Sequence, residues 1–209
     1  MPDNTPAPAL VLGSTSRYRR ELLERLGLPF EVRAPDVDET PQAGETPLAL
    51  AARLALAKAQ AVAATFGGGK ADSARDVVVI GSDQVADLQG QPLGKPGTHQ
   101  RATEQLRAMR GHTVLFHTAV CVVRPATGQV EQAVDTVQVR MRHLSDQDIE
   151  TYLRLEQPYD CAGSAKAEGL GIALLERITS DDPTALIGLP LITVTRLLRA
   201  VGLDVLAGR

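Results

Sequence analysis

Val77-Val78-Val79-Ile80-Gly81-Ser82-Asp83 is the stretch of sequence that decides the fold. Four consecutive apolar residues, all β-branched, are typical of a strand that is covered on both faces. We expect Gly81 and Ser82 to cut this strand off. Asp83 is therefore predicted at the carboxyl end of a buried strand, where its carboxylate would be available for chemistry.

The segments on either side of this stretch alternate between strand and helix patterns. Cap residues and apolar stripes at helical spacing mark the helices, and short apolar runs ending in turn residues mark the strands. Expected strands lie at 9–12, 30–34, 113–123, 130–140 and 169–178, and expected helices at 16–27, 46–66, 98–110, 145–155 and 190–201. The polar, glycine-rich stretch 67–76 is expected to be a loop. This interleaving predicts an α/β protein with a mixed β-sheet.

The composition bounds the class of protein. A chain of 209 residues with 44% hydrophobic content can bury a core, and its length fits one domain or two closely fused lobes. With a formal charge of −3, the chain lacks the excess of basic residues that is usual in nucleic-acid-binding proteins, so no nucleic-acid partner is expected. Residues 1–8 lack a signal-peptide pattern and no apolar run suits a membrane span, so no membrane partner is expected. Cys121 and Cys161 are too few for a zinc motif, and a reduced cytoplasmic setting is expected.

The first turn of the first expected helix concentrates positive charge. Arg17, Arg19 and Arg20 stand where the helix dipole is already positive, which is unfavourable unless an anion lies opposite. Ser14 and Ser16 add hydroxyl groups to the free backbone N–H groups of this turn. The turn is therefore a candidate phosphate cradle. The alternative is a solvated basic turn that Ser16 merely caps.

An acidic loop and the strand residue Asp83 are candidate metal ligands. The loop 36–40 contains Glu39, and Mg²⁺ or Mn²⁺ typically takes one or two carboxylates while water and phosphate fill its other positions. Glu39 and Asp83 would suffice for such a site. The alternative is an exposed acidic loop without a ligand.

Two lysines and a loop of small residues complete the candidate site. Lys58 lies beside the apolar stripe of its helix, and Lys95 follows Gly94 in a loop; each could bind phosphate or simply extend into solvent. The loop 161–169 places Glu168 among glycines. Its carboxylate can accept two adjacent N–H groups of a guanine base, which cytosine and thymine do not offer. A surface loop without a ligand is the alternative.

Taken together and in order, these segments resemble the Maf family of nucleotide pyrophosphatases. The matching segments are Leu12-Gly13-Ser14-Thr15-Ser16 with Arg19, Asp38-Glu39-Thr40, Gly81-Ser82-Asp83-Gln84, Gly94-Lys95-Pro96 and Gly163-Ser164-Ala165-Lys166-Ala167-Glu168-Gly169. Each motif is weak alone, but all of them in register over nearly the whole chain are specific. The Gly-Ser-Asp-Gln motif and the loop that begins at Cys161 are similar to the YceF-like branch, which acts on 7-methyl-GTP.

This resemblance implies a fold, a reaction and a set of site residues. The fold is an elongated α/β fold with two lobes around a cleft, as in inosine triphosphate pyrophosphatases, spanning residues 1–209 as a single domain and often dimeric. The reaction is hydrolysis of a nucleoside triphosphate to the monophosphate and pyrophosphate with Mg²⁺ or Mn²⁺. The implied site has Asp83 as the catalytic residue, Glu39 and Asp83 at the metal, Ser14, Arg19, Lys58, Lys95 and Lys166 at the substrate, and Tyr18, Gln84 and Glu168 setting base preference.

One departure from the branch bears on selectivity, and three other functions remain as alternatives. Position 18 often holds Trp in this branch, and Tyr18 is a poorer π partner for the cationic 7-methylguanine ring. The alternatives are a pyrophosphatase for dTTP and UTP, a nucleotide-binding regulator of cell division without turnover, and a nucleic-acid-binding module. Glu168 disfavours the first, and the acidic balance of the chain disfavours the last.

Overall fold

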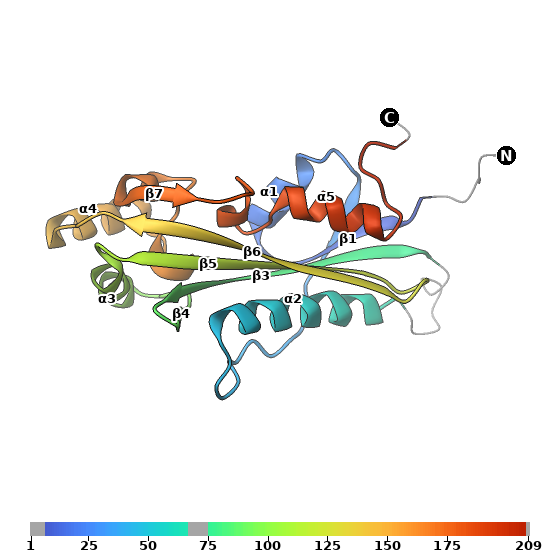
Figure 1. The fold of residues 1–209 in the computed structure, drawn as a ribbon, viewed down its shortest axis with the longest axis horizontal. Helices are drawn as coiled ribbons and strands as arrows, with labels where there is room; N and C mark the ends of the chain where they lie inside the picture. Colours follow the sequence, from blue (N-terminus) through green and yellow to red (C-terminus); the bar gives the residue numbers. More distant parts are fainter. Residues whose placement is uncertain (1–6, 67–74, 208–209) are drawn as a thin grey trace.

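A computed structural model of the protein describes residues 7–66 and 75–207. Within these residues, seven strands form one sheet in the order β2-β1-β3-β5-β6-β7, with β4 paired to the edge of β3 (Figure 1). β1 is parallel to β2 and to β3, and the other pairs are antiparallel. The strands are β1 (Ala9–Gly13), β2 (Phe30–Arg33), β3 (Val77–Leu88), β4 (Gln91–Leu93), β5 (Thr113–Arg124), β6 (Gln129–Met141) and β7 (Leu175–Thr179). The predicted mixed sheet is confirmed.

Helices cover both faces and one end of this elongated sheet (Figure 1). They are α1 (Arg17–Glu24), α2 (Pro47–Ala64), α3 (His99–Met109), α4 (Asp146–Glu156) and α5 (Leu191–Ala200). α2 lies on one face, α1 and α5 lie on the other, and α3 and α4 lie at the far end beside β7. The side-chain alternation of β1 serves both faces, since Leu10 and Leu12 pack toward α1 and α5 while Val11 packs toward α2. A third buried cluster joins α3 and α4 to the sheet.

Local signals set the helix starts. Thr46 accepts the backbone N–H of Ala49 and Pro47 takes the first helical position, so α2 begins where the cap pattern predicts. Ser145 and Asp148 form a complete capping box at α4. By length and composition α2 is the one described helix that could cross a membrane, but half of it is buried inside the protein. α2 is therefore the core helix of this fold.

Two sequence expectations about strands are wrong. β3 does not end at Gly81 but continues to Leu88, because β5 pairs with it from Val79 to Asp87. Asp83 therefore lies inside a long strand. The expected strand at 169–178 begins as the 3₁₀ turn Leu170–Leu174, since the Leu170 N–H donates to Glu156 Oε2 at 2.7 Å and wraps this segment around the end of α4. Most of the predicted loop at 67–76 lies outside the described residues.

One edge of β3 is interrupted, and the interruption positions the site. β1 ends at Gly13, which pairs with Gly81, and β4 pairs with β3 only from Ala86 onward. In the described part of the chain, residues 82–85 therefore have a strand neighbour on the β5 side alone. Successive side chains of a strand point to opposite faces of the sheet. Asp83 therefore borders this gap on one face, and Gln84 borders it on the other.

Candidate active site

A cleft of about 800 Å³ opens at the interrupted edge of β3. Its walls come from segments that are distant in sequence: the β1–α1 turn, α2, β3, the loop after β4, and the segments around 160–168 and 186–188. Among the residues predicted for the site, the lining contains Ser14, Tyr18, Arg19, Glu39, Lys58, Asp83, Gln84, Lys95 and Glu168, but not Lys166. Folding therefore collects nearly all of the candidate residues in one cavity.

Lys58 lies at the centre of the charged part of the cleft. Its Nζ atom is 2.6 Å from Asp83 Oδ1 and 2.6 Å from Glu39 Oε1. The side chains of Lys58 and Asp83 are only 8% and 11% exposed, whereas that of Glu39 is 62% exposed. The hydrogen bond from Lys58 holds the pKa of Glu39 below its ordinary value. One buried ammonium thus joins the two carboxylates predicted to bind a metal.

A glycine lets the helix that carries Lys58 approach the strand that carries Asp83. A Cβ atom on Gly81 would lie 2.5 Å from the backbone N of Ala59, too close for any residue other than glycine without a shift of the helix. Only a residue without a side chain lets α2 pack this closely on β3. The close approach places the Lys58 backbone directly over the strand that carries Asp83.

Arg19 supplies a second, half-buried cation near the carboxylates. Its Nε atom donates to the Gly188 carbonyl oxygen at 2.9 Å, and Ser82 Oγ donates to the same oxygen at 3.1 Å. Burial lowers the pKa of Arg19, while the charges of Asp83 and Glu39 act in the opposite direction. An arginine remains protonated in such a setting, so its charge is available to an anion in the cleft.

The two other predicted phosphate-binding lysines lie in different environments. Lys95 lines the cleft, and its charge contributes to the lowered pKa of Glu39. Lys166 is paired with Glu156, with 2.6 Å between its Nζ atom and Glu156 Oε1. Lys166 therefore points to α4 in this structure, and its role at the substrate stays a prediction.

The residues predicted to set base preference also line the cleft. Gln84 Nε2 donates to the carbonyl oxygens of Ala185 and Leu186 at 3.0 and 3.1 Å, which fixes the side-chain amide. The Arg17 guanidinium lies 4.7 Å from the centre of the Tyr18 ring and donates to its hydroxyl at 2.8 Å. Glu168 is a further lining residue of the cleft. A planar base could meet an aromatic ring, a fixed amide and a carboxylate here.

Arg53 holds the acidic loop in place, a role that no pattern in the sequence indicates. From α2 it donates to Glu45 Oε1 at 2.6 Å and to the Thr40 carbonyl oxygen at 3.1 Å. Thr40 follows Glu39 directly, so these contacts fix the position at which Glu39 reaches Lys58. A single arginine on an alanine-rich helix shows no pattern that distinguishes this function from simple solvation.

The carboxylate pair fits a divalent cation that is shared with phosphate. The two oxygen atoms that contact Lys58 are no farther apart than twice 2.6 Å, and both belong to hard oxygen ligands. No cluster of three or more His, Cys, Asp or Glu side chains suited to a metal occurs in residues 7–66 and 75–207. Carboxylate oxygens are the ligand type that Mg²⁺ and Mn²⁺ take, and such an ion needs only one or two of them from the protein.

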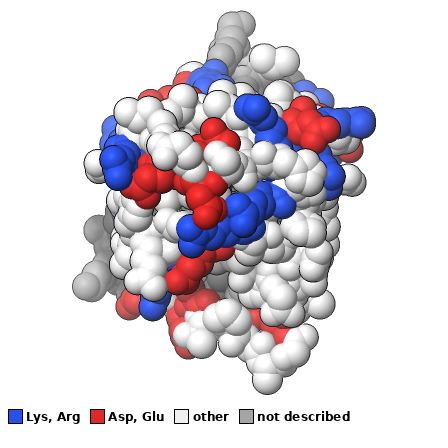
Figure 2. Space-filling view, turned by 90° about the vertical axis from the view of Figure 1, so that its left-hand side faces the viewer, with Lys and Arg blue, Asp and Glu red and all other residues white. Residues whose placement is uncertain are grey.

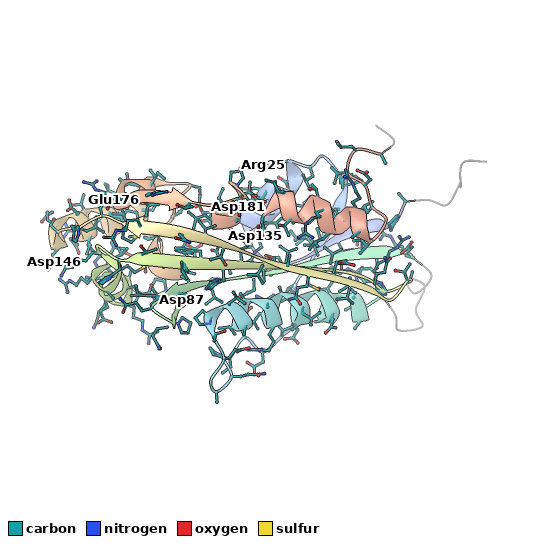
Figure 3. All side chains as sticks on the ribbon, viewed as in Figure 1. Arg25, Asp87, Asp135, Asp146, Glu176 and Asp181 are labelled. Carbon is teal, nitrogen blue, oxygen red and sulfur yellow. The ribbon has the colours of Figure 1, made fainter. Side chains whose placement is uncertain are left out.

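Other buried or clustered charges lie outside the cleft. Asp87, farther along β3, accepts the Gly90 N–H at 2.6 Å and lies 3.3 Å from His117 Nε2, and burial raises the pKa of Asp135 on β6 (Figure 3). At the α3–α4 end of the molecule, basic and acidic side chains alternate (Figure 2), and Asp146 pairs there with two arginines. None of these groups lines the cleft.

Comparison with known proteins identifies the family. The family profile described as Maf-like protein matches residues 9–201. A protein of Polaromonas sp. (strain JS666 / ATCC BAA-500) named 7-methyl-GTP pyrophosphatase is 64% identical over 96% of this chain and 88% of its own length. Proteins of the same name from Albidiferax ferrireducens and Cupriavidus pinatubonensis are 61% and 57% identical, over 94% and 95% of this chain and 95% and 96% of their own lengths. The chain therefore belongs to the family of Maf-like proteins, as the sequence motifs predicted.

Proposed function

We propose that this protein hydrolyses 7-methyl-GTP, or a related modified purine triphosphate, to the monophosphate and pyrophosphate. One observation carries the proposal: Arg19, Lys58 and Lys95 share a cleft with the carboxylates of Glu39 and Asp83. Cations that face two carboxylates suit a polyphosphate that arrives with a divalent metal. The names of the close relatives support the same reaction.

The chemistry follows from the charges in the cleft. Water attacks the α-phosphorus, a new P–O bond forms, the bond to the bridging oxygen breaks, and pyrophosphate leaves. Mg²⁺ or Mn²⁺ at Glu39 and Asp83 would neutralise charge on the triphosphate. Arg19 and Lys95 bind and orient its oxygen atoms, and Asp83, a largely buried carboxylate in the cleft, is the group assigned to accept the proton of water.

No covalent nucleophile is needed in this scheme. Phosphoryl transfer depends mainly on positioning and charge stabilisation. Cys161 is the thiol that lines the cleft, and burial raises its pKa to about 12, so it is not a thiolate near neutral pH. Direct attack by water agrees with the groups that line this cavity.

Base selection is assigned to three lining residues of the cleft, Tyr18, Gln84 and Glu168. The Glu168 carboxylate can accept the two adjacent N–H groups that guanine presents, and thymine and uracil lack this pair of donors. The Tyr18 ring offers a π face to a 7-methylguanine ring, which carries a positive charge. This arrangement favours a methylated purine over pyrimidines.

A substrate panel tests the proposal. Purified protein is assayed for released pyrophosphate with 7-methyl-GTP, GTP, dTTP and UTP, each with Mg²⁺ and with Mn²⁺. We expect the highest kcat/KM for 7-methyl-GTP. A higher kcat/KM for dTTP or UTP would show that the enzyme hydrolyses pyrimidine triphosphates instead. Tight nucleotide binding without turnover would favour a regulatory role.

The pair Asp83→Asn and Asp87→Asn tests the catalytic assignment. Both residues lie on β3 and point to the same face, but only Asp83 contacts Lys58 and lines the cleft. We expect Asp83→Asn to lose at least about 10²-fold in kcat, as when an essential acid–base group is removed. Asp87→Asn should retain turnover near that of the parent. An Asp83→Asn protein with unchanged turnover contradicts the assignment.

The proposal also covers the cellular location and the assembly of the enzyme. We place the enzyme in the cytoplasm, acting as a single unit over residues 1–209 on a free nucleotide, with a homodimer as the expected assembly. Light scattering of the purified protein measures the assembly, and cell fractionation measures the location.

A further inference from the structure

The contact between Lys58 and the two carboxylates has a consequence for metal binding. The ammonium lies 2.6 Å from one oxygen atom of each carboxylate, between the groups that would hold a divalent cation. Mg²⁺ binds carboxylate oxygens at about 2.0–2.1 Å. A metal on these oxygens would therefore lie within a few ångströms of Lys58 Nζ, and the two positive charges would repel each other strongly, because Lys58 and Asp83 are largely shielded from solvent.

The Lys58 ammonium cannot easily move away from the carboxylates by a shift of the whole helix α2. The buried α2 backbone rests on Gly81 and Gly13, and the Lys58 side chain is 8% exposed. Only the side chain can move, and it moves at low cost only if another anion accepts its charge.

The balance of charge around the pair favours an anion. Arg19 and Lys95 both act electrostatically on Glu39, so three cations face two carboxylates. Arg53, the next cation, is engaged by Glu45. The cleft lining as a whole carries four basic and four acidic side chains, so it is the local grouping of three cations around the carboxylate pair that favours phosphate oxygens over a bare divalent ion.

We propose that Lys58 keeps divalent metal off Glu39 and Asp83 until a triphosphate occupies the cleft. The incoming phosphate oxygens accept the Lys58 ammonium, and the freed carboxylates then bind the metal that accompanies the nucleotide. Lys58 thereby makes metal retention dependent on substrate. This inference rests on the proposed pyrophosphatase function and adds an order of binding to it.

Direct metal binding without nucleotide tests the proposal. Mn²⁺ affinity is measured by electron paramagnetic resonance of free Mn²⁺ for the parent, Lys58→Met and Lys95→Met. Both variants remove one positive charge from the cleft, but only Lys58 contacts the carboxylates. Removal of the contacting cation should tighten Mn²⁺ binding by about tenfold or more, and removal of Lys95 by clearly less, because Coulomb repulsion falls with distance.

A second variant and the parent protein keep the test decisive. Loss of Lys58 leaves Asp83 buried without its partner, so Lys58→Gln, which can still donate a hydrogen bond, is measured beside Lys58→Met, and circular dichroism checks that each is folded. If neither variant folds, the parent alone decides: it should bind Mn²⁺ weakly until a non-hydrolysable 7-methyl-GTP analogue is added.

Two outcomes overturn the proposal. One is unchanged or weaker Mn²⁺ binding in a folded Lys58 variant, and the other is tight Mn²⁺ binding by the nucleotide-free parent. Pyrophosphate release by the parent is assayed separately. Turnover with no effect of Lys58 on Mn²⁺ affinity refutes the order of binding alone, whereas the effect without turnover refutes the proposed reaction.

Discussion

Replacement of Gly81 by alanine should damage both the stability and the activity of this protein. A Cβ atom at position 81 would lie 2.5 Å from Ala59 N and 2.8 Å from Ala59 Cβ, and it would be closer still to the Ala55 carbonyl oxygen. These contacts involve the helix backbone and its Cβ, which cannot rotate away as a flexible side chain can. α2 must therefore retreat from β3.

The size of the effect follows from this geometry. To restore ordinary van der Waals contact, the middle of α2 must move by about 1 Å. Overpacking of this kind costs about 3 kcal/mol of unfolding free energy, the upper part of its usual range, because helix and strand are both pinned by the sheet. For a chain of this size, that corresponds to a fall in Tm of about 6–12 °C.

Gly81→Ala should lose most of its turnover even at temperatures where it is still folded. Lys58 lies on the part of α2 that would move, and its hydrogen bond to Asp83 is 2.6 Å long. A displacement of about 1 Å would lengthen this contact and would move Lys58 away from the position at which it meets the phosphate oxygens, and misplacement on this scale costs about 10²-fold in rate. We therefore expect Gly81→Ala to be folded at room temperature but nearly inactive.

Two measurements check this prediction: denaturant unfolding, and pyrophosphate release at a temperature where the variant is folded. Gly94→Ala is the control for stability, because a Cβ atom there would meet nothing within 4 Å. A Gly81→Ala protein with the stability and turnover of the parent would refute the argument that this close approach positions Lys58.

Three further predictions concern residues around the cleft. Arg53→Ala should raise the Mn²⁺ concentration needed for half-maximal turnover by several-fold, because the loop that carries Glu39 loses its anchor; an unchanged Mn²⁺ titration contradicts this role. Arg53 also holds the pKa of Glu45 at about 2, against an ordinary value of 4.5. Since the pKa of Glu45 is lower in the folded protein, its stabilising effect is complete above pH 4.5 and is lost as the pH falls toward 2. The difference in urea midpoint between the parent and Glu45→Gln should therefore shrink between pH 4.5 and pH 2 and stay constant above pH 4.5. Arg17→Ala removes the cation that lies 4.7 Å from the Tyr18 ring centre, and the ratio of kcat/KM for 7-methyl-GTP over GTP should rise by about 2- to 5-fold; a lower ratio would show that Arg17 supports the selection instead.

Local signals in the sequence were sufficient for most of the elements. The caps at Thr46 and Ser145 form as predicted, since each depends on residues only three positions apart. The mixed sheet follows from the alternation of strand and helix patterns. The end of β3 could not be predicted, because Gly81 and Ser82 look like a strand terminus until β5 pairs across them.

The sequence by itself determined most of the elements, the mixed sheet, the family and the kinds of residue brought to the candidate site. Only the tertiary structure decided that Lys58 joins Asp83 to Glu39, that Lys166 turns toward Glu156, and that Arg53 anchors the acidic loop. The reason is the distance along the sequence between the residues that interact. A cap or a strand pattern depends on neighbours along the chain, whereas the direction of a long charged side chain depends on how closely α2 approaches β3, and that distance is set by packing between segments far apart in sequence.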